Sequence, residues 1–440
     1  SALICGWLPA CEGWRVFGVI ADDLTGALDA ALLLHAGGVR APVIVGTDAL
    51  RRRPRQYPTV ILDVDSRGDD PDTAYSRVRE AARFLLNSGY TRLNKKMSST
   101  FQGHIGREVD AALDEAGSNF AIVVPSFPAN GRVTRDGVLY VDGVPLAETG
   151  VGRHPTSPIT DSYIPRVLQA QTRRKVGLVG LQVVRGGAET LRTELGRISS
   201  DTGMAVVDAV SDGDLEIIAE AARALVVTSG GSALAGKLPL PEDFSTGQPP
   251  AVPGSAAGGA LVLAGSVSPV TAGQVAFALA HGLDGLALDA VALLEPGGCG
   301  VEVSRAVAFV VDRLKAGRDA MVYTTHDPES QRLAAERAAE LGISRMESGL
   351  AIAGCLSEVA FRVIAATGLN RLIVAGGDTS STVCARLGLE EHVVLGELQT
   401  GIPLSLSSGR QTLVTVLKSG NFGTEDFFPL ALSRLKPGAQ

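Results

Sequence analysis

Two adjacent carboxylates, Asp22 and Asp23, follow a short apolar run near the start of the chain and are followed in turn by Leu-Thr-Gly. Where a strand turns into a helix, one carboxylate can cap the helix by accepting a hydrogen bond from a first-turn N–H group. The second is then suited to hold a sugar hydroxyl or to accept its proton. Gly26 permits either a close backbone approach or tight helix packing, and the sequence leaves both alternatives open.

A second cluster, Lys95 and Lys96, lies at the end of another predicted strand and continues into Ser98-Ser99-Thr100. Adjacent lysines alone are typical of a solvated strand edge. A turn rich in hydroxyls and glycines that enters a helix is instead typical of an anion site, because free N–H groups point at the ligand. A cation in such a turn suits a carboxylate ligand or a transferring phosphoryl group.

Three loops in the second half combine glycines with hydroxyl or charged side chains. The segment Gly-Gly-Asp-Thr-Ser-Ser begins at Gly376, directly after an apolar run, where glycines let main-chain N–H groups surround phosphates. It lacks the Gly-Lys-[Ser/Thr] ending of a P-loop, and Asp378 offers a carboxylate to Mg²⁺ instead. An ordinary tight turn with a helix cap is the alternative. Together with the loops that begin at Gly265 and Lys418, it predicts a nucleotide phosphate site.

The apolar runs before these loops predict the elements that position them. They alternate with Ala- and Leu-rich segments of helical period, which is typical of βαβ units. Open α/β sheets bind ligands at the carboxyl ends of their strands, where the polar clusters fall. We predict an α/β fold with two mostly parallel-sheet α/β domains and a cleft between them. The predicted strands are Val16–Ala21, Val60–Asp63, Arg92–Lys95, Phe120–Val124, Leu261–Ala264, Ala320–Tyr323, Leu372–Ala375 and Thr412–Leu417.

Length and composition support this organisation. A chain of 440 residues favours two or three domains, and 45% hydrophobic with 20% charged residues excludes a disordered or fibrous chain. Gly, Pro and Ser are concentrated between Gly236 and Gly258, as in a connector. We therefore expect an N-terminal domain over 1–235, a linker over 236–258 and a C-terminal domain over 259–440. The net charge of −7 disfavours a nucleic-acid partner.

Cysteine usage and hydropathy bear on the compartment. The five cysteines show no zinc spacing and no even framework, so we expect no disulfide framework and a reducing compartment. The most membrane-like stretch, 244–283, is broken by prolines and is expected to be linker followed by a buried strand. Residues 1–14 have no basic region before their apolar stretch and do not resemble a secretory signal. A cytoplasmic protein without a membrane partner is predicted.

Six motifs are spread over nearly the whole chain. Those of the first half are D-D-x-T-G at Asp22–Gly26, D-x-x-S-R at Asp63–Arg67, and G-R-x-T with G-x-P-L-x-E-T at Gly131–Thr149. Those of the second half are G-S-x-S-P-x-T-x-x-Q ending at Gln274, A-G-G-D-T-S ending at Ser380 and K-S-G-N-F-G-x-E-D-F ending at Phe427. In their order and combination they resemble the four-carbon acid-sugar kinase family, whose members phosphorylate erythronate, threonate or 3-oxo-tetronate with ATP.

The resemblance implies an N-terminal domain that binds the acid sugar and a C-terminal domain that binds ATP. On it we assign Asp23 as the base that orients the hydroxyl, Lys96 as a charge partner and Asp378 as the Mg²⁺ ligand. The residues expected around the acid sugar are Asp22, Asp23, Gly26, Arg67, Lys96, Ser99 and Thr100. Those expected around ATP are Gly265, Ser266, Ser268, Thr271, Gly376, Gly377, Asp378, Thr379, Lys418, Gly420 and Asn421.

One segment departs from the family pattern. The family's K-x-D-S-T-x-R-G is Lys96–Gly103 here, with Ser98 in place of Asp and Gln102 in place of Arg. The exchange removes an internal ion pair, reshapes the pocket for another substrate or ends catalysis, and the sequence leaves these three explanations open.

The function expected from all of this is an ATP- and Mg²⁺-dependent kinase of a small, four-carbon sugar acid. The alternatives are a kinase of a different small hydroxy acid and a non-catalytic nucleotide or sugar-acid binding protein. A dinucleotide oxidoreductase is disfavoured, since no G-x-G-x-x-G follows the first strand. The expected partners are the sugar acid and ATP, with no nucleic acid or membrane, and a homodimer is the candidate assembly.

Overall fold

The computed structural model of the chain describes residues 17–51, 57–150, 159–238, 258–324 and 327–436. The first half holds the strands β1 (Phe17–Ala21), β2 (Val43–Val45), β3 (Thr59–Asp63), β4 (Arg92–Lys96), β5 (Ala121–Val124), β6 (Arg132–Arg135), β7 (Val138–Val141), β8 (Val144–Pro145), β9 (Val176–Val179), β10 (Met204–Val207) and β11 (Val227–Gly230). The second half holds β12 (Leu261–Ala264), β13 (Asp284–Leu288), β14 (Ala320–Thr324), β15 (Arg371–Ala375), β16 (Leu389–Gln399), β17 (Ile402–Gly409) and β18 (Thr412–Lys418).

Helices alternate with these strands. In the first half they are α1 (Leu24–Ala36), α2 (Thr47–Arg51), α3 (Pro71–Asn87), α4 (Ile105–Ala116), α5 (Ile164–Gln169), α6 (Leu181–Arg185), α7 (Ala188–Ile198), α8 (Asp212–Ala221) and α9 (Ser232–Ala235). In the second half they are α10 (Pro269–Ala280), α11 (Gly298–Lys315), α12 (Pro328–Glu340), α13 (Arg345–Thr367), α14 (Gly377–Leu387) and α15 (Phe427–Arg434). The α/β prediction is confirmed.

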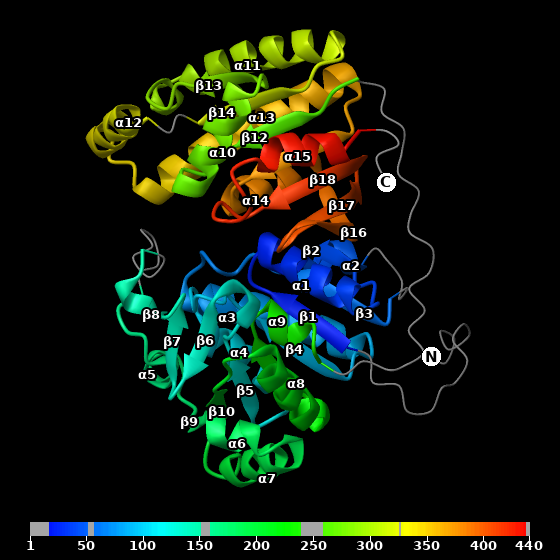
Figure 1. The fold of residues 1–440 in the computed structure, drawn as a ribbon, viewed down its shortest axis with the longest axis vertical. Coiled ribbons are helices and arrows are strands. Elements are labelled where there is room, and N and C mark those ends of the chain that lie inside the picture. Colours follow the sequence, from blue (N-terminus) through cyan, green and yellow to red (C-terminus); the bar gives the residue numbers. More distant parts are fainter. Residues whose placement is uncertain (1–16, 52–56, 151–158, 239–257, 325–326, 437–440) are drawn as a thin grey trace.

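Within the described residues, one sheet of 15 strands runs through both halves of the molecule, which lie one above the other in Figure 1. Its order is β13-β14-β12-β15-β18-β17-β16-β2-β3-β1-β4-β11-β5-β10-β9. Pairing is parallel from β2 to β9 and from β13 to β18, and antiparallel only around β16 and β17. A small antiparallel sheet, β6-β7-β8, stands beside the lower half.

Each half has one place where consecutive strands are added on opposite sides of a central strand. In the lower half β1 lies between β3 and β4, and in the upper half β12 lies between β14 and β15. Loops diverge at the carboxyl end of such a strand, which leaves room for a ligand between them. The polar clusters predicted from the sequence follow β1, β3 and β4 below, and β12, β15 and β18 above.

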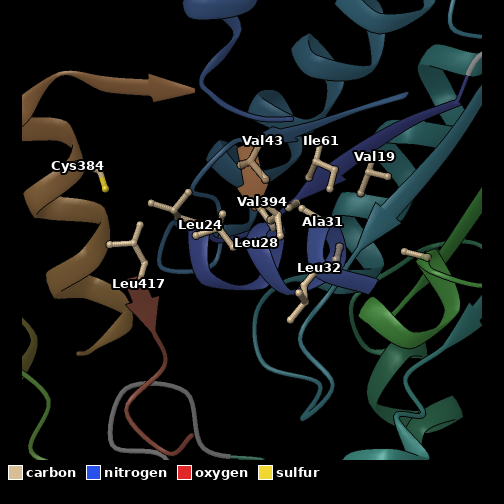
Figure 2. Close-up of a cluster of buried hydrophobic side chains, with 14 of the residues drawn as sticks. Val19, Leu24, Leu28, Ala31, Leu32, Val43, Ile61, Cys384, Val394 and Leu417 are labelled. Atoms are coloured by element: carbon tan, nitrogen blue, oxygen red, sulfur yellow. The ribbon is translucent and has the colours of Figure 1, made fainter. Parts of the chain in front are cut away.

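The two halves share a hydrophobic core and a strand pair. His392 and Glu391 of β16 pair with Val43 and Ile44 of β2, which makes the two sheets continuous. On one face of the sheet a single cluster of buried side chains crosses the junction. Figure 2 shows α1 at the centre of this cluster. Its Leu24 and Leu28 lie between the strands of the lower half and the upper-half elements α14 and β18, which carry Cys384 and Leu417. Burial of α1 from both sides therefore fixes its N-terminus at the junction.

The predicted strands all occur, and their ends lie within one residue of the prediction. Val16, the start of the first, lies outside the described residues, as do residues 1–14. Most of the predicted linker, 239–257, also lies outside them, and its flanks are the end of the lower half and the start of β12. The domain limits 1–235, 236–258 and 259–440 remain a prediction.

Two expectations about cysteines and membranes need correction. Cys299 and Cys355 form a disulfide, because α11 packs against α13 and brings their Cα atoms to 5.9 Å across a separation of 56 residues. Spacing along the chain cannot show such a contact. The described part of 244–283 forms α10 as well as β12. Among the described residues, one helix, Met346–Thr367, is long and apolar enough to cross a membrane, but its inward positions belong to the shared core, as in a buried helix of a globular protein.

Candidate active site

The carboxylates of Asp22 and Asp23 lie at the end of β1 and take different roles. Asp23 caps α1, because its Oδ1 accepts a hydrogen bond from Gly26 N at 3.1 Å and its Oδ2 accepts one from Thr25 Oγ1 at 2.7 Å. Asp22 is almost fully buried, and its Oδ1 has no hydrogen-bond partner among the residues that the structure describes. The capping residue is thus the one proposed as the base, and it keeps 15% of its side chain exposed against 1% for Asp22.

Arg67, from the loop after β3, binds both carboxylates. Its Nε lies 2.8 Å from Asp22 Oδ2 and its Nη2 lies 2.7 Å from Asp23 Oδ1. Burial would raise the pKa of Asp22, but Arg67 and the nearby lysines hold it well below its ordinary value. Burial would likewise lower the pKa of Arg67, and the two carboxylates raise it instead. Asp22 is therefore anionic at neutral pH, and Arg67 fixes the orientation of both carboxylates.

The side chains of Lys96 and Lys95 have different partners, Asp22 and Asp23 for Lys96 and Glu108 for Lys95. Lys96 Nζ lies 3.7 Å from Asp23 Oδ1 and 3.8 Å from Asp22 Oδ1, and it passes over the first turn of α1. A Cβ on Gly26 would lie 1.8 Å from this Nζ, so Gly26 serves a close approach, one of the two predicted alternatives. Lys95 is fully buried instead, with its Nζ 3.0 Å from Glu108 Oε2 and 2.8 Å from the Lys96 carbonyl.

The Lys95 and Glu108 pair also ties two loops of the site together. Glu108 accepts a hydrogen bond from Ser66, the residue before Arg67, while Lys95 holds the carbonyl of Lys96. The position of Lys95 next to Lys96 predicts that it lies beside the site, but the spacing of Lys95 and Glu108 along the chain does not show that β4 and α4 bury them together.

Within Lys96–Gly103, the segment that differs from the family pattern, Ser98 and Thr100 form an ordered turn. Ser98 Oγ lies 3.0 Å from Thr100 Oγ1 and accepts the Thr100 N–H at 3.3 Å, as an aspartate carboxylate does in an Asx turn. The hydroxyl of Thr100 is thus engaged within the turn. Ser99 is half-buried between them, and its Cβ lies close to Gly231, at the end of β11. Ser98 therefore preserves the shape of the loop without an acidic side chain.

Above the junction, the N-terminus of α14 lies at the site, and its N-cap residue is a glycine, which has no side chain to cap the helix. Gly376 has φ 126°, a conformation that favours glycine, and makes no side-chain cap. The first-turn N–H groups of Gly377, Asp378 and Thr379 therefore have no partner within the helix and suit an anion. A Cβ on Gly377 would lie 3.8 Å from Thr25 Oγ1, so the first turns of α14 and α1 face each other across the junction.

Lys418 ends β18 beside this helix. Its side chain is buried, with Nζ 3.1 Å from the Ser419 carbonyl and 3.3 Å from both Gly420 O and Thr271 Oγ1. Burial lowers the pKa of Lys418 to about 7. The described contacts of its Nζ are thus to neutral oxygen atoms, and an anionic ligand would raise that pKa again.

The hydroxyls after β12 hold the Lys418 loop in place. Ser268 Oγ and Thr271 Oγ1 both donate to the Gly420 carbonyl, at 2.7 and 2.8 Å, and Gln274 Nε2 donates to Phe422 O at 2.9 Å. Gly265 and Gly420 are close-packed, because Cβ atoms there would meet Thr379 Oγ1 at 2.3 Å and Ser266 Oγ at 2.2 Å. Gln274 was seen only as a motif residue in the sequence, and its role depends on this long-range contact.

Two of the predicted nucleotide residues are exposed. Asn421 lies on the surface of the Lys418 loop, and Asp378 lies in the first turn of α14. Burial raises the pKa of Asp65, Arg77 opposes that rise, and the negative charges of Asp69, Asp23 and Asp378 add to it. Within the described residues no three His, Cys, Asp or Glu side chains are grouped as metal ligands. Mg²⁺ is commonly held by one or two carboxylates together with substrate phosphates, and Asp378 fits that role.

Two protein families match the chain, one in each half. Residues 17–238 match a family described as a sugar-binding N-terminal domain, and residues 261–428 match a nucleotide-binding C-terminal domain. A 3-oxo-tetronate kinase of Pseudomonas savastanoi pv. phaseolicola is 35% identical over 435 residues, which cover 96% of this chain and 98% of that protein. One of Methylobacterium radiotolerans is 37% identical over 429 residues, covering 95% and 99%.

Solved structures show the same architecture. A Salmonella typhimurium LT2 protein superimposes with a TM-score of 0.78 at 30% identity, covering 94% of this chain and 98% of that one. Haemophilus influenzae protein HI1011 superimposes with a TM-score of 0.72 at 28% identity, covering 94% and 99%. The chain belongs to the four-carbon acid-sugar kinase family, as its motifs implied.

Proposed function

We propose that the protein is an ATP-dependent kinase that phosphorylates a hydroxyl of a small, four-carbon sugar acid such as erythronate, threonate or 3-oxo-tetronate. The observation that carries the proposal is the meeting of two unlike helix N-termini. The first turn of α1 bears a carboxylate held by Arg67, and the first turn of α14 presents free N–H groups, with Thr25 close to Gly377 between them. A hydroxyl acceptor and a phosphate donor suit these two sides.

The lower half would bind and orient the acceptor. Two contacts hold the Asp23 carboxylate in place: the hydrogen bond with which it caps α1 and the ion pair with Arg67. It would accept a hydrogen bond from the substrate hydroxyl and then the proton of that hydroxyl. As the proton leaves, the hydroxyl oxygen bonds to the γ-phosphorus and the bond to the bridging oxygen of ADP breaks. Lys96, 3.7 Å from Asp23, would neutralise charge on the transferring group.

The upper half would bind ATP. Gly376, Gly377 and Thr379 would offer main-chain N–H groups to the phosphates, and Lys418 would supply a positive charge from the next loop. Ser268, Thr271 and the glycines Gly265 and Gly420 support the proposal by fixing the Lys418 loop. Ser266 and Asn421 complete the set that we place near the nucleotide. Phosphoryl transfer depends mainly on such positioning and charge neutralisation.

We assign Mg²⁺ to Asp378 together with the phosphates. The Asp378 carboxylate would hold the ion beside the phosphates, where it would supply positive charge. We also propose the domain roles 1–235 for the acid sugar and 259–440 for ATP, a cytoplasmic location and a homodimer as the assembly.

A second candidate, a binding protein without catalysis or a kinase of another hydroxy acid, is favoured by Ser98 and Gln102. The turn made by Ser98 argues for an intact loop, since its hydroxyl occupies the place of the missing carboxylate. The experiment is an ADP-release assay with Mg²⁺ and ATP against four-carbon aldonic and oxo-acids, with glycerate and five-carbon acids as outliers. ADP release with one four-carbon acid supports the proposal. Silence across the panel, with ATP binding confirmed by calorimetry, refutes it in favour of a kinase of a different hydroxy acid or of the binding protein.

A further inference from the structure

Three buried polar side chains, those of Lys95, Glu108 and Ser66, form a connected network beside the candidate active site. All three are fully buried. Lys95 Nζ, on β4, lies 3.0 Å from Glu108 Oε2 on α4, and Ser66 Oγ, in the loop after β3, donates a hydrogen bond to Glu108 Oε1. Because the protein covers each of these side chains, the network acts on the site only through the residues that it holds.

One end of the network holds the backbone of Lys96. Successive side chains of a strand point to opposite faces, so Lys95 meets α4 while Lys96 passes over the first turn of α1. Lys95 Nζ donates a hydrogen bond to the Lys96 carbonyl at 2.8 Å, and Ser229 Oγ on β11 donates one to the Lys95 carbonyl at 2.9 Å. Two buried side chains therefore fix the strand end from which Lys96 reaches Asp23.

The other end of the network holds the loop that carries Arg67. The N–H groups of Ser66 and Arg67 both donate to the Asp22 carbonyl, at 3.0 and 3.2 Å, which ties the loop to β1. The Ser66 hydroxyl ties the same loop to Glu108 of α4. Arg67 in turn binds both carboxylates of the site, at 2.8 and 2.7 Å. Glu108 is therefore the point at which this loop is joined to β4.

A fully buried ion pair is a poor means of stabilising a fold. Taking both ions out of water is costly, and well-packed apolar side chains of similar volume are often as stable in the same place or more so. Lys95 and Glu108 expose 0% and 1% of their side chains, whereas Arg83 and Glu115, a pair on the surface of the same helix, expose 52% and 16%. The buried pair instead sets the distance between two loops of the site, where a displacement of about 1 Å can lower a rate by about 100-fold.

We propose that the network of Lys95, Glu108 and Ser66 positions the cations of the site for phosphoryl transfer. It holds Lys96 and Arg67 in place beside the two carboxylates without contact with the substrate. The three are positioning residues, since they act through their neighbours. This inference rests on the proposed function and deepens it.

The first test removes both charges of the network together. Lys95→Met with Glu108→Met leaves no buried charge of the pair uncompensated, so the double variant should unfold at about the Tm of wild type or above it. In the ADP-release assay, with the acid found active in the panel, its kcat should fall about 100-fold. The KM for ATP should change little, because the ATP loops lie in the upper half. A purely structural role predicts the reverse, a lower Tm with an unchanged kcat.

The second test, Ser66→Ala, leaves the ion pair intact. It removes the hydrogen bond from the Arg67 loop to Glu108, while Lys95 keeps its partner. The kcat of Ser66→Ala should fall about 10-fold with the KM for ATP little changed.

A second ion pair of α4 provides the matched control. Asp110 Oδ1 lies 3.0 Å from Nε of Arg174, which precedes β9 and is not among the residues of the site. Asp110→Asn with Arg174→Gln should therefore keep the kcat of wild type. Wild-type kcat in either network variant, or an equal loss in the control, would overturn the inference. If the double variant does not fold, Ser66→Ala decides alone, and absence of ADP release by wild type would refute the proposed function and this inference with it.

Discussion

Lys418 should take up a proton when ATP binds. Burial lowers its pKa to about 7 in the free protein, against an ordinary value of 10.5. At pH 8 only about 10% of the free protein would carry the charge at Lys418, and at pH 6 about 90% would. Phosphates beside Nζ favour the charged form and would return the pKa toward its ordinary value. The uptake should therefore be about 0.9 proton per nucleotide at pH 8 and about 0.1 at pH 6.

The assay is calorimetry of MgATP binding in buffers of different ionisation enthalpy, because the slope of observed enthalpy against that quantity gives the protons taken up. Lys418→Met should bind ATP more weakly and lose the dependence on buffer at pH 8. Lys436→Met is the control, since Lys436 is exposed, and it should keep the wild-type slope. A wild-type slope of zero at pH 8, with ATP bound, would refute the placement of Lys418 beside the phosphates.

Three further predictions concern the lower half and the junction. Asp23→Asn should lower kcat by about 10²- to 10⁴-fold with the Tm little changed, and wild-type turnover in the ADP assay would exclude Asp23 as the base. Gly26→Ala should lower kcat/KM by about 100-fold, because its Cβ displaces Lys96 Nζ, while urea unfolding should show little loss of stability. Burial lowers the pKa of His392 to about 4, so the unfolded chain binds more protons between pH 6.5 and 4, and stability falls as pH falls through that window. From pH 7 to pH 5 wild type should lose about 2 kcal/mol more than His392→Gln in urea unfolding, and equal losses would contradict this.

Much of each half could be predicted, because local patterns determine it. Runs of four to six residues, most of them apolar, followed by polar clusters predicted β1, β3, β4 and β5 below and β12, β14, β15 and β18 above, since parallel strands are buried on both faces. Motif order then divided acid-sugar loops from nucleotide loops.

Features that depend on long-range packing could not be predicted. The β16 to β2 pair, which joins both sheets, links residues about 350 positions apart and has no local signal. The Cys299 to Cys355 disulfide depends on helix packing in the same way. The hydrogen bonds by which Ser268 and Thr271 hold the Lys418 loop form only because distant loops meet.

The central claim is phosphoryl transfer from ATP to a hydroxyl of a sugar acid between α1 and α14. The most direct measurement is ³¹P NMR of the protein with Mg²⁺, ATP and the acid that releases most ADP. The account predicts one new phosphate monoester for each ADP formed, with no inorganic phosphate beyond a control without protein. ADP accompanied by inorganic phosphate and no ester, or no reaction with any four-carbon acid, would contradict it.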